Sequence, residues 1–169
     1  MIVVTNVVGI DFGTTNSVLT TVDQNGVVRP WRYNKPDGTL MRTVLTFLPQ
    51  NGAEEAIIGA RAEELQRDSR AASFASWKRQ LGDEELKQVD VFGRTKNLVD
   101  LTAIFLGKLV VPVAGSDRLR AVMTVPANAP ELQLQRMRLA AEAARIDVLG
   151  WLKEPTAAAV AYGLHRSKD

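Results

Sequence analysis

Three β-rich segments follow one another at the start of the chain, and they constrain the fold more than any other feature. Residues 7–12 form an apolar run, residues 17–22 are again apolar and β-branched, and residues 27–33 follow an Asn-Gly turn signal. Because short turns join antiparallel neighbours, we expect a three-stranded antiparallel meander. The chain is therefore predicted to begin with a sheet.

The second half of the chain alternates helix and strand signals. Apolar residues recur at helical spacing over residues 101–111, and a β-rich run over residues 119–125 ends at Pro126. A further short strand is expected over residues 148–152. A meander followed by alternating helices and strands implies a mixed sheet with helices packed on its faces. The predicted class is α/β.

Two helices of this half have recognisable starts. Asn128 and Glu131 resemble a capping box with Asn in the Ser/Thr position, and Pro155 suits the first turn of a final helix. Each helix has one expected buried face, formed by Leu134, Met137, Ala141 and Ala144 in the first and by Ala157, Val160, Ala161 and Leu164 in the second.

The middle of the chain has a different composition. A loop over residues 34–38 precedes two short predicted strands, 44–48 and 56–58. Residues 60–78 are rich in Ala, Glu, Arg and Leu without Pro or Gly, which favours a helix that Gly82 would end. Residues 39–100 are therefore interpreted as an insertion.

Composition excludes several classes of function. The 169 residues suit one domain, 46% are hydrophobic and 24% charged, and the net charge is only +2, so neither disorder nor a nucleic-acid-binding face is expected. The sequence contains no cysteine, which excludes disulfides, thiolate catalysis and cysteine zinc sites. His165, the single histidine, is interpreted as a surface residue. Without a secretory signal or a membrane span, the expected location is the cytoplasm.

The segment from Gly9 to Ser17, Gly-Ile-Asp-Phe-Gly-Thr-Thr-Asn-Ser, is the most informative about chemistry. Asp11 ends a buried strand just before a turn rich in Gly and hydroxyl groups. Such a turn can direct backbone N–H groups and the hydroxyls of Thr14 and Thr15 toward a phosphate, and Asp11 suits Mg²⁺. A plain hairpin turn is the alternative. Neither a Walker A motif nor Gly-x-Gly-x-x-Gly is present, so P-loop and Rossmann folds are unsupported.

Four segments resemble the 70-kilodalton heat-shock chaperone family. Residues 9–17 look like its first phosphate signature, with Phe12 where Leu is usual, and residues 74–82 are similar to its segment with the catalytic lysine. Residues 122–127 and 154–164 resemble its second and third hallmarks, so the resemblance spans almost the whole chain.

The resemblance implies the first lobe of an actin-like ATPase domain, with a ribonuclease-H-like core. Residues 1–38 and 101–169 would form the core subdomain, and residues 39–100 a smaller inserted α+β subdomain. The second ATPase lobe, the interdomain linker and the peptide-binding domain would be absent from this chain.

The resemblance also implies roles for individual residues. Four residues would bind the β- and γ-phosphates of ATP or ADP: Gly13, Thr14, Thr15 and Asn16. Asp11 would hold hydrated Mg²⁺, Lys78 would reach the γ-phosphate and orient the attacking water, and Glu154 would lie near the metal and water shell. The residues themselves leave alternatives open, since Lys78 could be a solvated lysine at a helix end and Glu154 an acid facing a helix dipole.

Pro126 is an allosteric candidate. In the family, a proline at this place and a nearby surface arginine transmit the nucleotide state to the peptide-binding domain. Here Leu134 stands at the arginine's place, and Arg136 lies two residues further along, on a different helix face. Coupling of the usual kind is therefore in question, and Pro126 could instead simply end its strand.

The predicted function is the first lobe of the nucleotide-binding domain of an ATP-dependent chaperone, which binds ATP and Mg²⁺ and works with a second lobe, a peptide-binding domain and co-chaperones. Little activity is expected from this lobe alone. One alternative is a truncated, non-catalytic binding or regulatory module, in which the uncovered wall of the cleft would bind a partner or a second copy of the chain. Another is a sugar kinase or filament protein of the actin-like superfamily.

Overall fold

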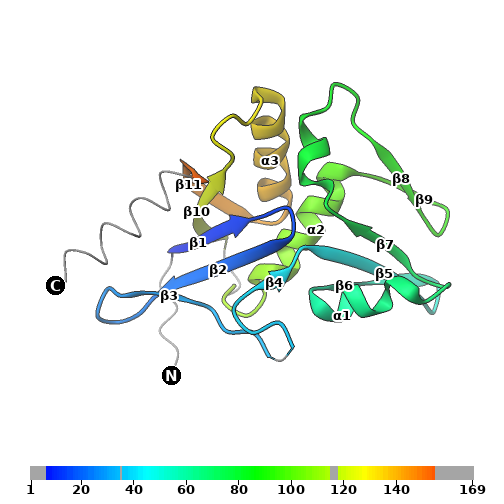
Figure 1. Cartoon of the computed structure of the whole chain (residues 1–169), viewed down its shortest axis with the longest axis horizontal. Helices are drawn as coiled ribbons and strands as arrows, with labels where there is room; N and C mark the ends of the chain where they lie inside the picture. The colour runs from blue at the N-terminus through cyan, green and yellow to red at the C-terminus, as the bar shows by residue number, and fades with distance from the viewer. Residues whose placement is uncertain (1–6, 35, 115–117, 155–169) are drawn as a thin grey trace.

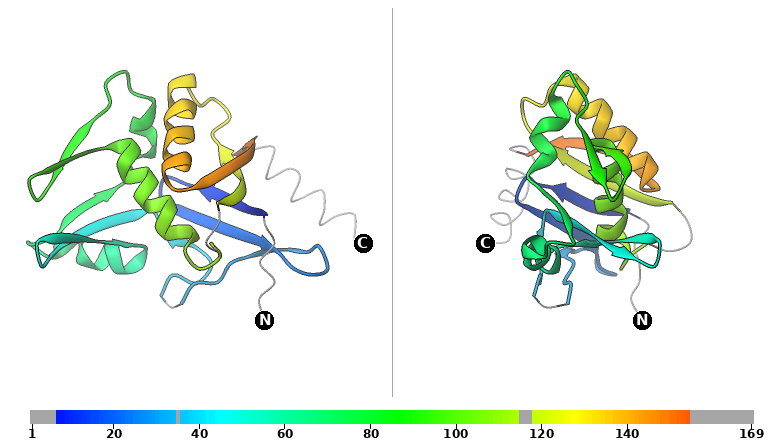
Figure 2. Two further views of the ribbon diagram at one scale, coloured as in Figure 1. Left: turned by 180° about the vertical axis from the view of Figure 1, so that it is seen from behind. Right: turned by 90° about the vertical axis from the view of Figure 1, so that its right-hand side faces the viewer.

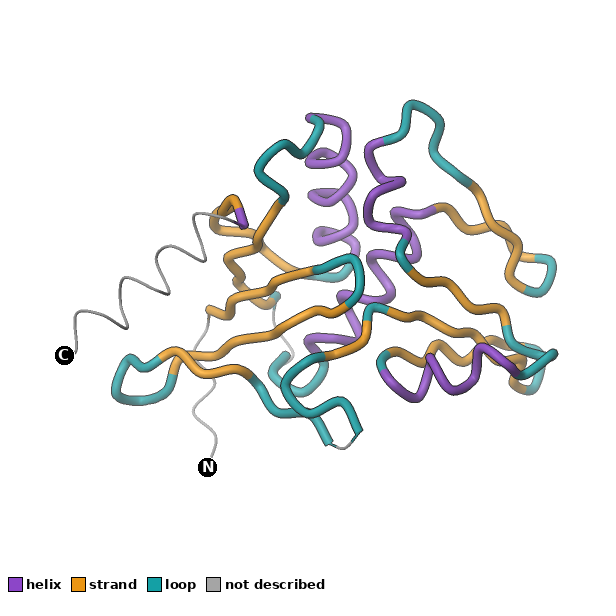
Figure 3. The backbone as a smooth tube through the Cα atoms, in the orientation of Figure 1, coloured by secondary structure: helices purple, strands orange, loops and turns teal. Residues whose placement is uncertain are grey.

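The computed structural model describes residues 7–34, 36–114 and 118–154, and they form a mixed α/β structure (Figures 1 and 3). Its largest sheet has the strand order β11-β10-β1-β2-β3, with β4 paired to β2. The strand bounds are β1 Val7–Phe12, β2 Asn16–Val22, β3 Val28–Pro30, β4 Met41–Arg42, β10 Leu119–Val125 and β11 Ile146–Lys153.

The largest sheet is mixed, as predicted. The β1–β2 and β2–β3 pairs are antiparallel, whereas β10 lies parallel to both β1 and β11. The expected meander is confirmed, although β3 is shorter than residues 27–33. Parallel pairing of β1 with β10 places Asp11 and Pro126 near the same edge of the sheet, because the carboxyl ends of parallel strands point the same way.

Two helices, α2 (Leu98–Val110) and α3 (Glu131–Ala143), lie side by side on one face of this sheet (Figure 2). The start of α2 is capped by Asn97, whose side chain accepts from two backbone N–H groups while Asp100 accepts from the Asn97 N–H. The core between sheet and helices includes Ile10, Phe12, Leu101, Phe105, Leu109, Met123, Met137 and Ala141. Burying each of the Ile, Phe, Leu and Met side chains among them stabilises the fold by about 1.5–3 kcal/mol.

A second sheet lies beside the first and has the antiparallel order β6-β5-β7 (Figure 1). Its strands are β5 (Val44–Gln50), β6 (Ala53–Ile58) and β7 (Ala72–Ala75), and a separate hairpin joins β8 (Gln88–Val91) to β9 (Arg94–Asn97). The two strands predicted at 44–48 and 56–58 are confirmed and are longer. The subdomain boundaries at residues 38 and 100 stay a prediction.

The helix predicted over residues 60–78 is wrong. Only α1 (Ala60–Glu64) and a short 3₁₀ turn, η1 (Leu65–Arg67), are helical before Asp68. The Asp68 side chain accepts from the Arg70 N–H at 2.9 Å and forms a turn, after which β7 pairs with β5. Side-chain bonding at this turn and strand pairing therefore override the helix propensity of the segment.

The capping box predicted at Asn128 and Glu131 is also wrong. The helix α3 begins at Glu131 with Pro130 as its N-cap and has no side-chain cap. The Ala129 N–H bonds to the Pro126 carbonyl at 3.2 Å, so Asn128 lies inside a turn before the helix. Met137 and Ala141 are buried as expected.

The predicted final helix from Pro155 onward, and His165, lie outside the described residues. Within residues 7–34, 36–114 and 118–154, no helix is both long enough and apolar enough to cross a membrane.

Candidate functional site

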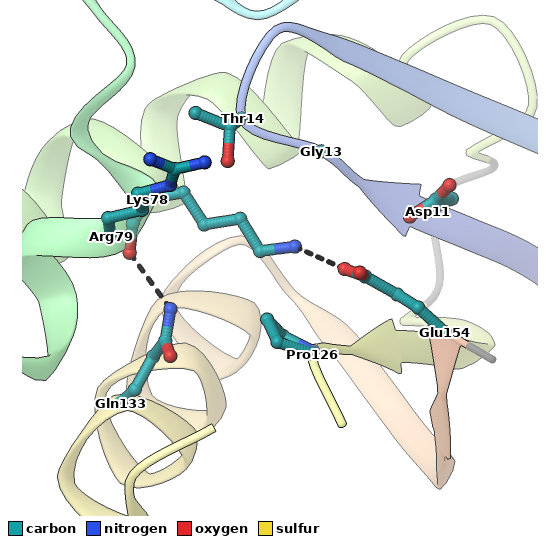
Figure 4. A pocket seen from close by; sticks show the side chains of 8 residues that line it. All are labelled: Asp11, Gly13, Thr14, Lys78, Arg79, Pro126, Gln133 and Glu154. Carbon is teal, nitrogen blue, oxygen red and sulfur yellow. Dashed lines mark hydrogen bonds and ion pairs between the residues drawn. The ribbon is translucent and has the colours of Figure 1, made fainter. Parts of the chain in front are cut away.

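A pocket of about 420 Å³ opens where β1 and β10 end (Figure 4). It is lined by Asp11, Gly13, Thr14, Lys78, Arg79, Pro126, Gln133 and Glu154. Six of these eight residues are predicted site residues, and they come from positions as far apart in the sequence as Asp11 and Glu154. The two predicted site residues that do not line this pocket are Thr15 and Asn16.

Glycine is required at residue 13 by the path of the β1–β2 loop. A Cβ atom on Gly13 would lie 2.1 Å from the backbone carbonyl oxygen of Asn16, a contact that no side chain can make without moving the loop. This close approach lets the loop turn sharply at the mouth of the pocket. Thr14 then lines the pocket, whereas Thr15 is exposed and its carbonyl accepts from the Thr43 N–H at 2.8 Å.

Asn16 is bonded to Arg42 on β4, the strand that pairs with β2 in the same sheet. Its amide oxygen accepts from Arg42 Nη1 at 3.2 Å, and the same guanidinium bonds both carboxylate oxygens of Glu63 on α1. The hydrogen-bonded pair of Arg42 and Glu63 raises the pKa of Arg42 and lowers the pKa of Glu63. The structure thus assigns the Asn16 side-chain oxygen a contact that sequence patterns do not reveal.

Lys78 is buried, so the alternative of a solvated lysine is wrong. It belongs to the 3₁₀ turn η2 (Trp77–Gly82), and its side chain is 4% exposed. Its Nζ donates to Glu154 Oε1 at 2.8 Å and lies 5.9 Å from the centre of the Phe12 ring. A buried ammonium requires such a partner, because desolvation of an unpaired charge is costly.

Glu154 and Asp11 supply the negative charge of the pocket. The Glu154 side chain is 43% exposed and points toward Lys78 (Figure 4). The Asp11 carboxylate is exposed and accepts from the Thr124 hydroxyl at 2.6 Å. Glu154 thus neutralises the buried Lys78. The second carboxylate oxygen of Asp11 has no bond to any described residue.

Two residues that line the pocket, Arg79 and Gln133, were not predicted as site residues from the sequence. Arg79 follows Lys78 and adds a second cation to the pocket. Gln133, on α3, is buried and its Nε2 donates to the Lys78 carbonyl at 2.9 Å. In the sequence, Gln133 is a polar residue directly before the expected apolar face that begins at Leu134. A helical pattern assigns such a polar residue to the solvent-exposed side.

Together, these groups form a polar pocket beside two strand ends of an α/β sheet, a usual place for ligand sites. Two cations, loop amides and a threonine hydroxyl can bind an anion, and the exposed carboxylate can bind a hydrated divalent cation. Among the described residues, no group of three or more His, Asp or Glu side chains is placed to hold a metal ion.

Comparison with known proteins gives the family. The model of the Hsp70 protein family matches residues 52–169. The chain is 31% identical over 185 residues to "Chaperone protein HscA homolog" of Photobacterium profundum, covering 96% of this chain and 29% of that protein. The proteins of the same description from Ralstonia nicotianae and Pseudomonas aeruginosa are 33% and 32% identical, with the same coverage. The chain belongs to the Hsp70 family, and it spans about 29% of the length of these relatives.

Proposed function

We propose that this chain is the first lobe of the nucleotide-binding domain of an ATP-dependent chaperone and binds the phosphates of Mg-ATP and Mg-ADP. The observation that carries the proposal is the meeting of Asp11, Thr14, Lys78 and Glu154 around one pocket. Family membership supports an actin-like ATPase fold, with residues 1–38 and 101–169 as the core subdomain and residues 39–100 as the smaller one.

Three of the lining residues suit the binding of phosphate groups directly: Gly13, Thr14 and Lys78. The loop at Gly13 and Thr14 offers backbone N–H groups and a hydroxyl, and Lys78 offers a cation for the terminal phosphate. We assign Thr15 and Asn16 to the same loop, where their backbone can contribute although their side chains lie outside the pocket. Transfer of a phosphoryl group depends mainly on positioning and charge neutralisation, which these groups provide.

The acidic residues fit a magnesium ion that is held mostly through water and phosphate. Mg²⁺ retains several water ligands and uses one or two carboxylates, so Asp11 with Glu154 nearby is a sufficient protein contribution. Bound Mg²⁺ would neutralise phosphate charge. Glu154, freed from Lys78 when a phosphate takes the ammonium, would accept hydrogen bonds from the water shell.

The relatives' name, chaperone, supports a role in binding client proteins, with a second lobe, a peptide-binding domain and co-chaperones as partners. A cytoplasmic location agrees with that role. Membership in the Hsp70 family also disfavours the sugar-kinase and filament alternatives. Pro126, at the end of β10 and on the pocket wall, is the residue through which we propose that the nucleotide state is transmitted.

Titration calorimetry with Mg-ADP and Mg-ATP tests the nucleotide proposal. The 169-residue chain is expected to bind both weakly, to lose the binding when Mg²⁺ is chelated, and to hydrolyse ATP little. Lys78→Met and Asp11→Asn should each weaken binding, whereas Lys87→Met, at an exposed lysine away from the pocket, should not.

Two results would contradict the proposal. The first is that the chain binds neither nucleotide. If light scattering then showed a stable dimer, the alternative of a non-catalytic module would be favoured. The second is binding that Lys78→Met and Asp11→Asn leave unchanged, because the nucleotide would then lie elsewhere.

A further inference from the structure

Arg136 is buried on α3, yet it forms no ion pair with any residue that the structure describes. Its guanidinium donates instead to three backbone carbonyls, those of Leu81 at 3.0 Å, Asp83 at 2.5 Å and Glu84 at 3.1 Å. A charged side chain is costly to bury, so a residue that is 8% exposed and whose guanidinium is bonded only to backbone groups has a specific structural role.

The three carbonyls lie at the end of the turn that bears Lys78. Carbonyl groups at the end of a helical turn lack partners within the turn, and a guanidinium has enough donors to bond several of them at once. Gln133, three residues before Arg136 and therefore on the same side of α3, bonds the Lys78 carbonyl near the start of η2. One helix face thus holds both ends of η2.

Close packing between α3 and η2 supports this arrangement. A Cβ atom on Gly82 would lie 3.3 Å from Pro130 Cγ and 3.7 Å from Gln133 Cβ, so the end of η2 lies directly against the first turn of α3. Figure 1 shows η2 alongside α3. The direction of the Lys78 side chain therefore depends on the position of α3.

We propose that Arg136, assisted by Gln133, is a positioning residue that fixes the backbone of η2 and thereby holds the Lys78 ammonium in the pocket. Only the expected effect on phosphate binding, which a lysine held in place would strengthen, rests on the proposed function. The placement of the Lys78 backbone and ammonium by Arg136 does not depend on it.

Residue-specific acetylation of lysines, followed by peptide mass spectrometry, tests the positioning role without any ligand. Lys78 is expected to react slowly in the wild-type chain because its side chain is 4% exposed and paired. In Arg136→Met, which keeps an unbranched apolar stem but removes the donors, Lys78 should react about tenfold faster, a size within the range of coupling through one hydrogen-bond network. Arg138→Met, on the exposed side of the same helix, is the matched control and should leave the rate unchanged.

Lys96 is an internal control for general loosening. It is paired with Glu54, its side chain is 17% exposed, and it lies on β9, outside the α3–η2 contact. Faster acetylation of Lys78 alone supports the proposal. An unchanged Lys78 rate, or an equal rise at Lys78 and Lys96, would overturn it. Should Arg136→Met not fold, Arg136→Lys and Gln133→Met replace it, with smaller increases expected at Lys78 only.

A second measurement separates this proposal from the proposed function. In a double-mutant cycle, Arg136→Met should weaken Mg-ADP binding in the wild-type background and have little further effect in Lys78→Met, because Arg136 acts through Lys78. Additive losses would contradict the positioning role. If the wild-type chain binds no Mg-nucleotide, the proposed function fails, and the acetylation result still decides whether Arg136 positions Lys78.

Discussion

The two walls of the pocket are fixed by different means. One wall, here called the β1–β2 wall, is the loop that contains Gly13 and Thr14. Its shape is set within the loop itself, because Gly13 permits a close contact with the Asn16 carbonyl that any side chain would block. The η2 wall is only six residues long and is held from outside by Thr102 on α2 and by Gln133 and Arg136 on α3.

The two walls should therefore tolerate different substitutions. A locally determined loop is sensitive to its own residues and little affected by distant ones. A segment held by other helices is sensitive to residues that never touch the ligand. We therefore expect the largest effects within the β1–β2 loop and at Lys78, and graded effects at the groups that hold each wall.

The largest effect is expected from Gly13→Ala. The added methyl group would meet the Asn16 carbonyl at 2.1 Å, so the loop must move, and displacement of a binding group by about 1 Å can cost about a hundredfold. Mg-ADP affinity measured by calorimetry should fall by about that factor. The matched control is Gly107→Ala in α2, where a Cβ meets nothing within 4 Å and should stabilise the helix by about 0.5–1 kcal/mol. Unchanged affinity in Gly13→Ala would show that the loop does not bind the nucleotide.

The next effect is expected from Lys78→Met. Methionine has a similar length and fits the apolar contact with Phe12, so the fold should persist while the cation is lost. A hydrogen bond between charged groups contributes about 1.5–3 kcal/mol, which corresponds to an affinity loss of about 10- to 100-fold for Mg-ADP. If affinity falls no more than in Lys87→Met, the η2 wall has no part in binding.

The same contrast explains how much could be predicted from the sequence. The local pattern of a strand, a tight turn and a second strand points to Asp11 and Thr14 but leaves a plain hairpin turn open, and the resemblance to the heat-shock chaperones adds Gly13, Lys78 and Glu154. The mixed sheet follows from the alternation of strands and helices. The segment holding Lys78 was predicted as the end of a long helix, since its composition favours helix and nothing local indicates that residues 72–75 pair with β5. Gln133 and Arg136 were missed because polar residues on a helix are normally exposed.

Thr102→Val should destabilise the η2 wall without touching the pocket. The Trp77 indole N–H, which is buried, donates to the Thr102 hydroxyl at 2.9 Å, and valine would leave this donor without a partner. The expected loss is about 1–3 kcal/mol in the free energy of unfolding, measured by urea denaturation. The control, Thr95→Val at an exposed position of β9, should change stability by less than about 0.5 kcal/mol. Equal losses in the two variants would mean that the hydrogen bond does not anchor η2.

The smallest effect is expected from Arg42→Met, which removes the bridge from the β1–β2 loop to α1. Because the shape of the loop is set by its own residues, Mg-ADP affinity should change by less than about threefold, and the half-exposed ion pair should contribute little to stability.

Arg42 lowers the pKa of Glu63 below its usual value of 4.5, so the contribution of the pair is present above that pH and disappears as the pH falls through the lowered value. The urea midpoints of the wild type and Arg42→Met should therefore differ slightly at pH 7 and converge in acid, whereas Arg61→Met, in an exposed pair on α1, should show no effect on the loop. A tenfold loss of affinity in Arg42→Met would mean that the β1–β2 wall, like the η2 wall, is held from outside.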